Sequence, residues 1–166
     1  MTIVDNIRGS LADGFAVFAD LPGFFASHGG TIPPHVLVSN LKPDLLLINE
    51  SSCTIILLEL TCPWDANIAT SHTFKLEKYS PLVADLSRRY TVHYYPVEIS
   101  VRGQVSKSNR ARLKSLVFNC VERSNSKKVT KSLLYSCSKA SLLCSYSIFL
   151  ARKEPSWASP NLINIC

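Results

Sequence analysis

The sequence predicts an α/β fold in which helices cover both faces of a mixed central sheet. Two short apolar stretches, residues 45–49 and 53–61, lie close together and have the length of buried strands. Because these stretches are apolar at nearly every position, we expect both faces of the sheet to be covered. A helical pattern and a further strand follow, and two more helical segments occupy the C-terminal third of the chain.

The N-terminal part predicts smaller elements around these two strands. Residues 2–12 have apolar side chains at helical spacing, and residues 15–21 form a first strand that ends at a Pro-Gly pair. Residues 35–38 are expected to be a short extended piece. Residues 49–52 make the turn between the two central strands.

A long helix is predicted after the second central strand. Pro63 stops the strand, and Asp65 is well placed as the N-cap of the helix. Pro81 falls within the helical pattern, so it should kink the helix or split it in two. At roughly 100° per residue, one apolar stripe collects Ile68, His72, Leu76, Tyr79, Val83, Leu86 and Tyr90.

The C-terminal third predicts one strand and two helices. The strand covers residues 91–101, and Pro96 indicates a bulge or an edge position. A basic helix covers residues 106–123, and a polar linker separates it from a second helix at residues 129–153. The residues of the basic helix expected to face inward are Leu113, Leu116, Val117 and Cys120.

Length and composition predict one folded domain. The chain has 166 residues, of which 46% are hydrophobic and 18% charged, and this composition argues against disorder. We expect the domain to cover residues 1–153 and a loose tail to cover residues 154–166. The six cysteines include no C-x-x-C pair, so we expect most of them to be small core residues.

No segment is predicted to cross a membrane. Two glutamates interrupt residues 45–60, and residues 140–151 are too short for a bilayer. Residues 1–12 lack the basic start and long apolar core of a signal peptide. The prediction is therefore a soluble intracellular protein, nuclear or cytoplasmic.

Two carboxylates lie at neighbouring ends of the central strands. Asp44 opens the first strand, and Glu59 lies near the end of the second. An unpaired buried charge is costly, and two adjacent carboxylates repel each other unless a cation lies between them. Mg²⁺ and Mn²⁺ prefer such oxygen ligands. The sequence therefore predicts that Asp44 and Glu59 hold a divalent metal.

Pro43-Asp44, followed by Glu59-Leu60-Thr61, resembles the P-D…(D/E)-x-K motif of the restriction-endonuclease-like nuclease superfamily. The resemblance implies a restriction-endonuclease-like sheet and hydrolysis of phosphodiester bonds in DNA. It also implies that Asp44, Glu59 and the backbone carbonyl of Leu60 bind Mg²⁺ or Mn²⁺. The chain departs from the motif at Thr61, which occupies the position of the lysine that orients or activates the attacking water.

A lysine on the following helix could replace the missing one. Residues 75–79, K-L-E-K-Y, are similar to the Q-x-x-x-Y motif of RecB-like members of the superfamily, with Lys75 in place of Gln and with Tyr79 matching. Lys75 borders the predicted buried face, whereas Lys78 points more to solvent. Lys75 is therefore the predicted catalytic cation, and a solvated surface lysine is the alternative.

Several segments are similar to a region downstream of the polymerase in animal reverse-transcriptase-type mobile elements. They include K-P-D-L-L-L-I, L-L-E-L-T-C-P-W-D and V-E-I-S-V-R-G. The resemblance implies an origin in such an element, within a larger reverse-transcriptase polyprotein. The first helix is longer in members of the nuclease superfamily, so we expect that this chain starts late.

Three further residues could support the site, each with an alternative. Asp20 could join the metal site or cap a turn. His72 could be a core histidine with one hydrogen bond, a general base or a ligand. Glu98 could line the cleft or pair with Arg102.

Charge is distributed unevenly along the chain. Residues 1–100 carry 6 Lys/Arg and 10 Asp/Glu, and residues 101–166 carry 12 and 2. The basic half could bind a polyanion, or its cations could simply solvate helices. The candidate nucleic-acid-binding residues are Arg102, Lys107, Arg110, Arg112 and Lys114.

These observations predict a metal-dependent DNA endonuclease whose substrate is DNA or an RNA–DNA hybrid. One alternative is an inactive nucleic-acid-binding or assembly module that keeps the nuclease fold, which Thr61 favours. Another is a relic that does not fold alone. A homodimer and a monomer both stay open.

Overall fold

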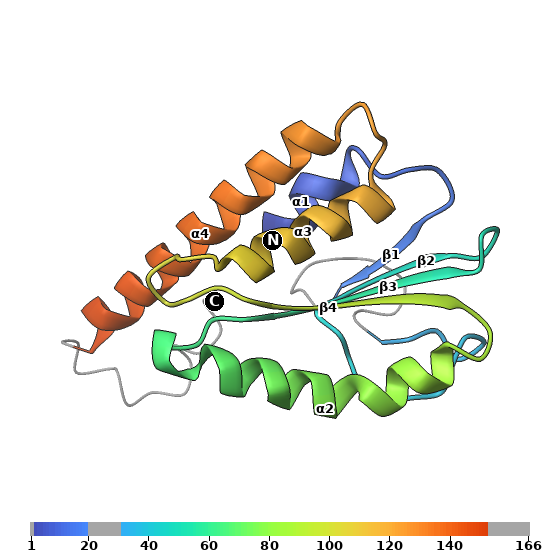
Figure 1. Ribbon diagram of the computed structural model, residues 1–166, viewed down its shortest axis with the longest axis horizontal. Helices are drawn as coiled ribbons and strands as arrows, with labels where there is room; N and C mark the ends of the chain where they lie inside the picture. The colour runs from blue at the N-terminus through green and yellow to red at the C-terminus, as the bar shows by residue number, and fades with distance from the viewer. Residues whose placement is uncertain (1, 20–30, 153–166) are drawn as a thin grey trace.

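The computed structural model describes residues 2–19 and 31–152 and contains a four-stranded sheet in the order β1-β2-β3-β4 (Figure 1). The strands are β1 (Ala16–Ala19), β2 (Leu45–Asn49), β3 (Thr54–Thr61) and β4 (Thr91–Glu98). The first three are antiparallel neighbours, and β4 runs parallel to β3. The mixed sheet predicted from the sequence is therefore confirmed.

Helices cover both faces of this sheet (Figure 1). α2 (Ile68–Leu86) connects β3 to β4 and covers one face. α1 (Thr2–Arg8), α3 (Lys107–Cys120) and α4 (Ser126–Ala151) cover the other. Successive residues of β2 enter the two cores in turn, which explains why the strand is apolar at almost every position.

The β2–β3 hairpin fixes the register on which the candidate site depends. Leu45 pairs with Leu58, and Asn49 pairs with Thr54 at the turn. The side chain of Asn49 accepts a hydrogen bond from the backbone N–H of Ser52 at 3.0 Å, so a buried amide holds the turn in place. The register continues outward and brings Asp44 next to Glu59.

Two local predictions before β4, those for Asp65 and for residues 35–38, are wrong. Asp65 does not cap α2 but begins a 3-10 turn, Asp65–Asn67, because Arg102 binds its carboxylate. α2 continues through Pro81 without being split. Residues 35–38 are not extended, since the N–H groups of Val36 and Leu37 both donate to the carbonyl of Pro33.

The C-terminal helices largely confirm the prediction. Ser106 caps α3 by accepting a hydrogen bond from the N–H of Asn109 at 3.1 Å. All four residues expected to face inward on α3 are buried. The linker has the predicted length but lies earlier in the chain, at residues 121–125, because α3 ends at Cys120 and α4 begins at Ser126. Pro96 lies on β4, an edge strand of this sheet, as predicted.

The loop between β4 and α3 packs closely against α4. Gly103 has φ 76°, and a Cβ at this position would lie 2.6 Å from the carbonyl oxygen of Ser138. The hydroxyl of buried Ser141 donates to the carbonyl of Ser100 at 2.7 Å. These contacts determine where the end of β4 lies relative to α4.

The cysteines divide into two groups. Cys120 and Cys137 are buried core residues, and burial raises the pKa of each thiol to about 12. Cys53 and Cys62 are exposed, contrary to the prediction that most cysteines are core residues. Within the described residues, the cysteines form no disulfide.

α4 is longer than residues 140–151, the apolar segment that was expected to be too short for a bilayer. It has 26 residues, and its most apolar 18-residue window has a mean hydropathy of 1.3, so length and composition alone would allow it to cross a membrane. One side of the helix packs on α1 and α3. Only 17% of its apolar window is buried.

Candidate functional site

Asp44 and Glu59 lie together where β2 begins and β3 approaches its end. The backbone N–H of Asp44 donates to Glu59 Oε1 at 3.2 Å. In return, Asp44 Oδ2 accepts a hydrogen bond from the N–H of Leu60 at 2.7 Å. Glu59 is only 2% exposed, whereas Asp44 is open to solvent. The site therefore combines one buried and one accessible carboxylate.

Lys75 reaches this pair from α2. Its ammonium group forms an ion pair with Glu59 Oε2, and its side chain is only 18% exposed. Lys78 is exposed and lies 5.0 Å from the ring centre of Tyr79. Of the two lysines proposed from the helix pattern, Lys75 is therefore the one in contact with Glu59.

Two tyrosines, Tyr79 buried and Tyr94 partly buried, hold Lys75 and its helix against the sheet. The hydroxyl of Tyr79 donates to the carbonyl of Lys42 at 3.2 Å, and that of Tyr94 donates to the carbonyl of Lys75 at 3.0 Å. Burial, reinforced by the negative charge of Glu59, raises the pKa of both tyrosines above the usual range. Both hydroxyls therefore remain protonated donors at neutral pH.

Thr61 lies two residues beyond Glu59, on the same face of β3. Its hydroxyl oxygen is buried and has no hydrogen-bond partner among the described residues. Buried polar atoms are rarely left without a hydrogen bond in folded proteins, so this hydroxyl oxygen is a candidate partner for a bound water or ion. The side chain supplies no positive charge at the motif's lysine position.

A second buried carboxylate, Glu98, lies beside Thr61 on β4. Glu98 Oε1 is 3.0 Å from His72 Nδ1, and Arg112 Nη2 is 3.0 Å from His72 Nε2. Because arginine only donates, Nε2 accepts and Nδ1 carries the proton that faces Glu98. His72 is therefore held at both ring nitrogens, rather than by the single hydrogen bond expected of a core histidine.

Arg102 does not pair with Glu98 as the sequence alternative suggested. Its guanidinium binds Asp65 instead. A hydrogen bond from Ser100 and the charge of Arg102 lower the pKa of Asp65. Sequence reasoning missed the partnership of His72 with Arg112, because nothing in the local pattern of α3 indicates that Arg112, its third cation, turns inward.

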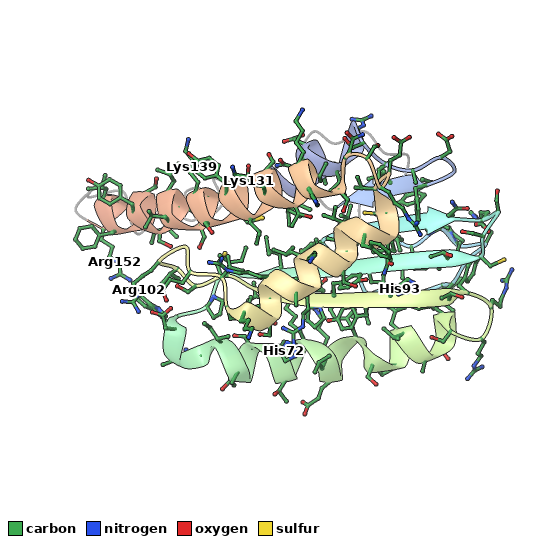
Figure 2. The ribbon with its side chains drawn as sticks, turned by 45° about the horizontal axis from the view of Figure 1, so that its top comes forward. His72, His93, Arg102, Lys131, Lys139 and Arg152 are labelled. Carbon is green, nitrogen blue, oxygen red and sulfur yellow. The ribbon has the colours of Figure 1, made fainter. Side chains whose placement is uncertain are left out.

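A cavity of about 370 Å³ opens beside this cluster, lined by His72, Glu98, Asn109 and Arg112. Figure 2 shows His72 on the side of α2 that faces the sheet and α3. Asn109 donates from its side chain to the carbonyl of Glu98 at 2.6 Å. These groups join α2, β4 and α3 at the edge of the sheet.

The basic residues proposed to bind nucleic acid do not form one group. Lys107, Arg110 and Lys114 are exposed on α3. Arg112 turns towards Glu98 and Arg102 towards Asp65, so both are already paired within the protein. Three of the five residues predicted to bind nucleic acid are therefore exposed and unengaged by these two ion pairs, and all three lie on α3.

The donor set fits a hard divalent cation with few protein ligands. Within the described residues, no cluster of three or more His, Cys, Asp or Glu side chains could hold a metal. Asp20 lies outside the described residues. Mg²⁺ commonly takes only one or two carboxylates, and waters and phosphate oxygens fill its other positions. Asp44, Glu59 and the carbonyl of Leu60 could supply such a partial shell.

No protein-family model matches the chain, and no curated protein matches it.

Proposed function

We propose that this chain is a metal-dependent endonuclease acting on DNA. The observation that carries the proposal is the contact of Lys75 with Glu59, next to Asp44. Two carboxylates and a lysine thus lie together, which supports the resemblance to the P-D…(D/E)-x-K motif, although the lysine comes from α2 rather than from the end of β3. The mixed sheet supports this proposal at the level of architecture.

Asp44, Glu59 and the Leu60 carbonyl would hold Mg²⁺ or Mn²⁺. When bound, such a metal lowers the pKa of a coordinated water and offsets negative charge on a phosphate. Lys75 would place its ammonium group where negative charge develops during phosphodiester hydrolysis. Tyr79 and Tyr94 would keep that lysine in position through their contacts with α2 and the segment before β2.

The substrate proposal rests on charge. Lys107, Arg110 and Lys114 present exposed cations on α3, in the half of the chain that carries 12 Lys/Arg and 2 Asp/Glu. Phosphate contacts of this kind supply most non-specific nucleic-acid affinity. The similarity to mobile-element proteins extends the proposal to RNA–DNA hybrids and to a place within a larger reverse-transcriptase polyprotein.

Cleavage of a supercoiled plasmid in Mg²⁺ or Mn²⁺ tests the proposal directly. Lys75→Ala should lower the rate by about 10² or more, a typical loss for one electrostatic group in an active site. Lys78→Ala is the matched control, since Lys78 lies one helical turn away and does not contact Glu59. Equal rates for Lys75→Ala and wild type would exclude Lys75 as the catalytic cation.

An inactive binding module is the second candidate, and a specific observation favours it. Lys75 pairs with Glu59, and Thr61 stands where the motif has a lysine. Under this alternative, wild type binds DNA but cuts nothing, and Thr61→Lys restores metal-dependent cleavage. If wild type cuts nothing in Mg²⁺ or Mn²⁺ while Thr61→Lys does, the binding module is the better description.

A further inference from the structure

The C-terminal half of α4 exposes large apolar side chains to solvent. The exposed residues in this half are Leu142, Leu143, Tyr146, Ile148, Phe149 and Leu150. The preceding half is different, because Val129, Leu133 and Cys137 are buried in the core. The core therefore takes the first half of α4, whereas these apolar side chains of the second half are exposed.

The exposed side chains follow a spacing typical of paired helices. Tyr135, Leu142 and Phe149 are separated by seven residues each, and Tyr146 lies between the last two. A seven-residue apolar repeat keeps side chains on one face of a helix and forms the seam of a helix–helix contact. This spacing favours a helix as the partner.

A groove lies beside this half of α4. Its volume is about 370 Å³; Leu142 and Phe149 line one side, and Trp64 and Val101 also contribute to its lining. Arg102 and Arg152 also line it, and Figure 2 shows them at the same end of the molecule. Side chains of a partner protein can enter such a recess, whereas a flat bilayer surface would leave it unfilled.

Charge defines the partner further. Residues 126–152 contain five Lys/Arg and no Asp or Glu. A second copy of the chain would bring the same cations against this surface, and like charges across an interface are unfavourable. A partner with carboxylates beside its apolar stripe would be complementary.

We propose that α4 and its groove bind an amphipathic helix of a partner protein, with an apolar stripe flanked by Asp and Glu. The seam from Tyr135 to Phe149 spans 14 residues, or about 21 Å, which matches about four turns of a partner helix. Aromatic side chains at the centre of such a contact contribute most of the affinity, and Arg152 selects the acidic flanks.

The test uses the full chain and a fluorescein-labelled synthetic peptide with Leu at helical spacing on one face and Glu elsewhere. Fluorescence anisotropy should show binding that weakens at least about tenfold in Phe149→Ser and in Arg152→Glu. Phe118→Ser is the matched control, because Phe118 on α3 is 60% exposed, close to the 56% of Phe149, and lies outside the groove. Its affinity should equal that of wild type.

Four results would overturn the proposal. A scrambled peptide of the same composition that binds equally well would remove the helix requirement. A wild-type dimer in light scattering that Phe149→Ser converts to a monomer would assign the surface to a second copy. Binding to phosphatidylserine vesicles without binding to the peptide would assign it to a membrane. Tighter peptide binding by a chain ending at Arg152 would show that residues 153–166 occupy the groove.

Discussion

At the scale of single residues, the sequence located Asp44, Glu59 and Lys75 because strand register and helix periodicity bring them together. Leu45 pairs with Leu58 on the antiparallel strand. Asp44, which precedes Leu45, therefore lies beside Glu59, which follows Leu58, at the same end of the sheet. A helix that returns along the sheet then brings its inward lysine to Glu59. The contacts of Arg112 could not be predicted in this way, because they depend on how α3 is positioned around the edge of β4.

Metal binding is the first prediction at this scale. Mg²⁺ or Mn²⁺ should raise the melting temperature of the wild-type protein, because a ligand that binds only the folded state stabilises it. The expected stabilisation is about 2.7 kcal/mol at a hundredfold excess over the dissociation constant.

Asp44→Asn should abolish this gain, since it removes a ligand charge while its side-chain oxygen can still accept from Leu60. Glu77→Gln, an exposed carboxylate on α2, is the control and should keep the full response. A metal response in Asp44→Asn as large as that of wild type would contradict the assigned site.

The buried Tyr79 predicts that the stability of the folded protein falls at alkaline pH. Burial and Glu59 raise the pKa of Tyr79 in the folded protein, while an unfolded tyrosine ionises near about pH 10. The stability that this hydroxyl contributes is therefore complete below about pH 10 and is lost as the pH rises further. Urea unfolding should show a smaller loss between about pH 9 and pH 11 for Tyr79→Phe than for wild type. Equal losses would mean that Tyr79 does not carry the effect.

At the scale of elements, the apolar strands and α3 were predictable, whereas loops and helix ends depended on distant partners. β2 agrees with the prediction at both ends, because its length and apolar character are local properties. Asp65 had the chemistry of an N-cap but bound Arg102, which lies beyond the next strand. A local rule cannot anticipate such a competitor, and α2 begins two residues later than an N-cap at Asp65 would place it, at Ile68.

The loop between β4 and α3 provides a stability prediction for an element. Gly103→Ala should destabilise the fold by about 1–3 kcal/mol, because it combines a positive φ with a Cβ pressed against the Ser138 carbonyl. Gly9→Ala is the control, since a Cβ at Gly9 would meet nothing within 4 Å. Chemical denaturation measures both, and equal stabilities of the two variants would show that the loop can move away from α4.

At the scale of the whole molecule, the sheet divides the protein into two differently charged parts. The candidate site lies between the sheet and α2, and α3, which carries the surface cations, covers the opposite face of the sheet (Figure 1). Composition predicted this separation along the chain but not its placement in space. The structure also pairs Arg102 and Arg112 internally, which reduces the predicted polyanion-binding group to the exposed cations of α3.

DNA binding should reflect this reduced set of cations. We expect affinity for duplex DNA to fall steeply with salt. In a plot of the logarithm of the association constant against the logarithm of the salt concentration, each phosphate contact should contribute a slope of about −0.9. Lys114→Ala should lower the magnitude of that slope by about 1, because Lys114 is exposed and could bind a phosphate.

Lys78→Ala on α2 is the control, because Lys78 is also exposed but lies away from α3. Anisotropy measured over a salt series distinguishes the two. An unchanged slope in Lys114→Ala, or binding that does not respond to salt, would exclude α3 as the DNA-binding surface, even if the carboxylate site cleaves DNA.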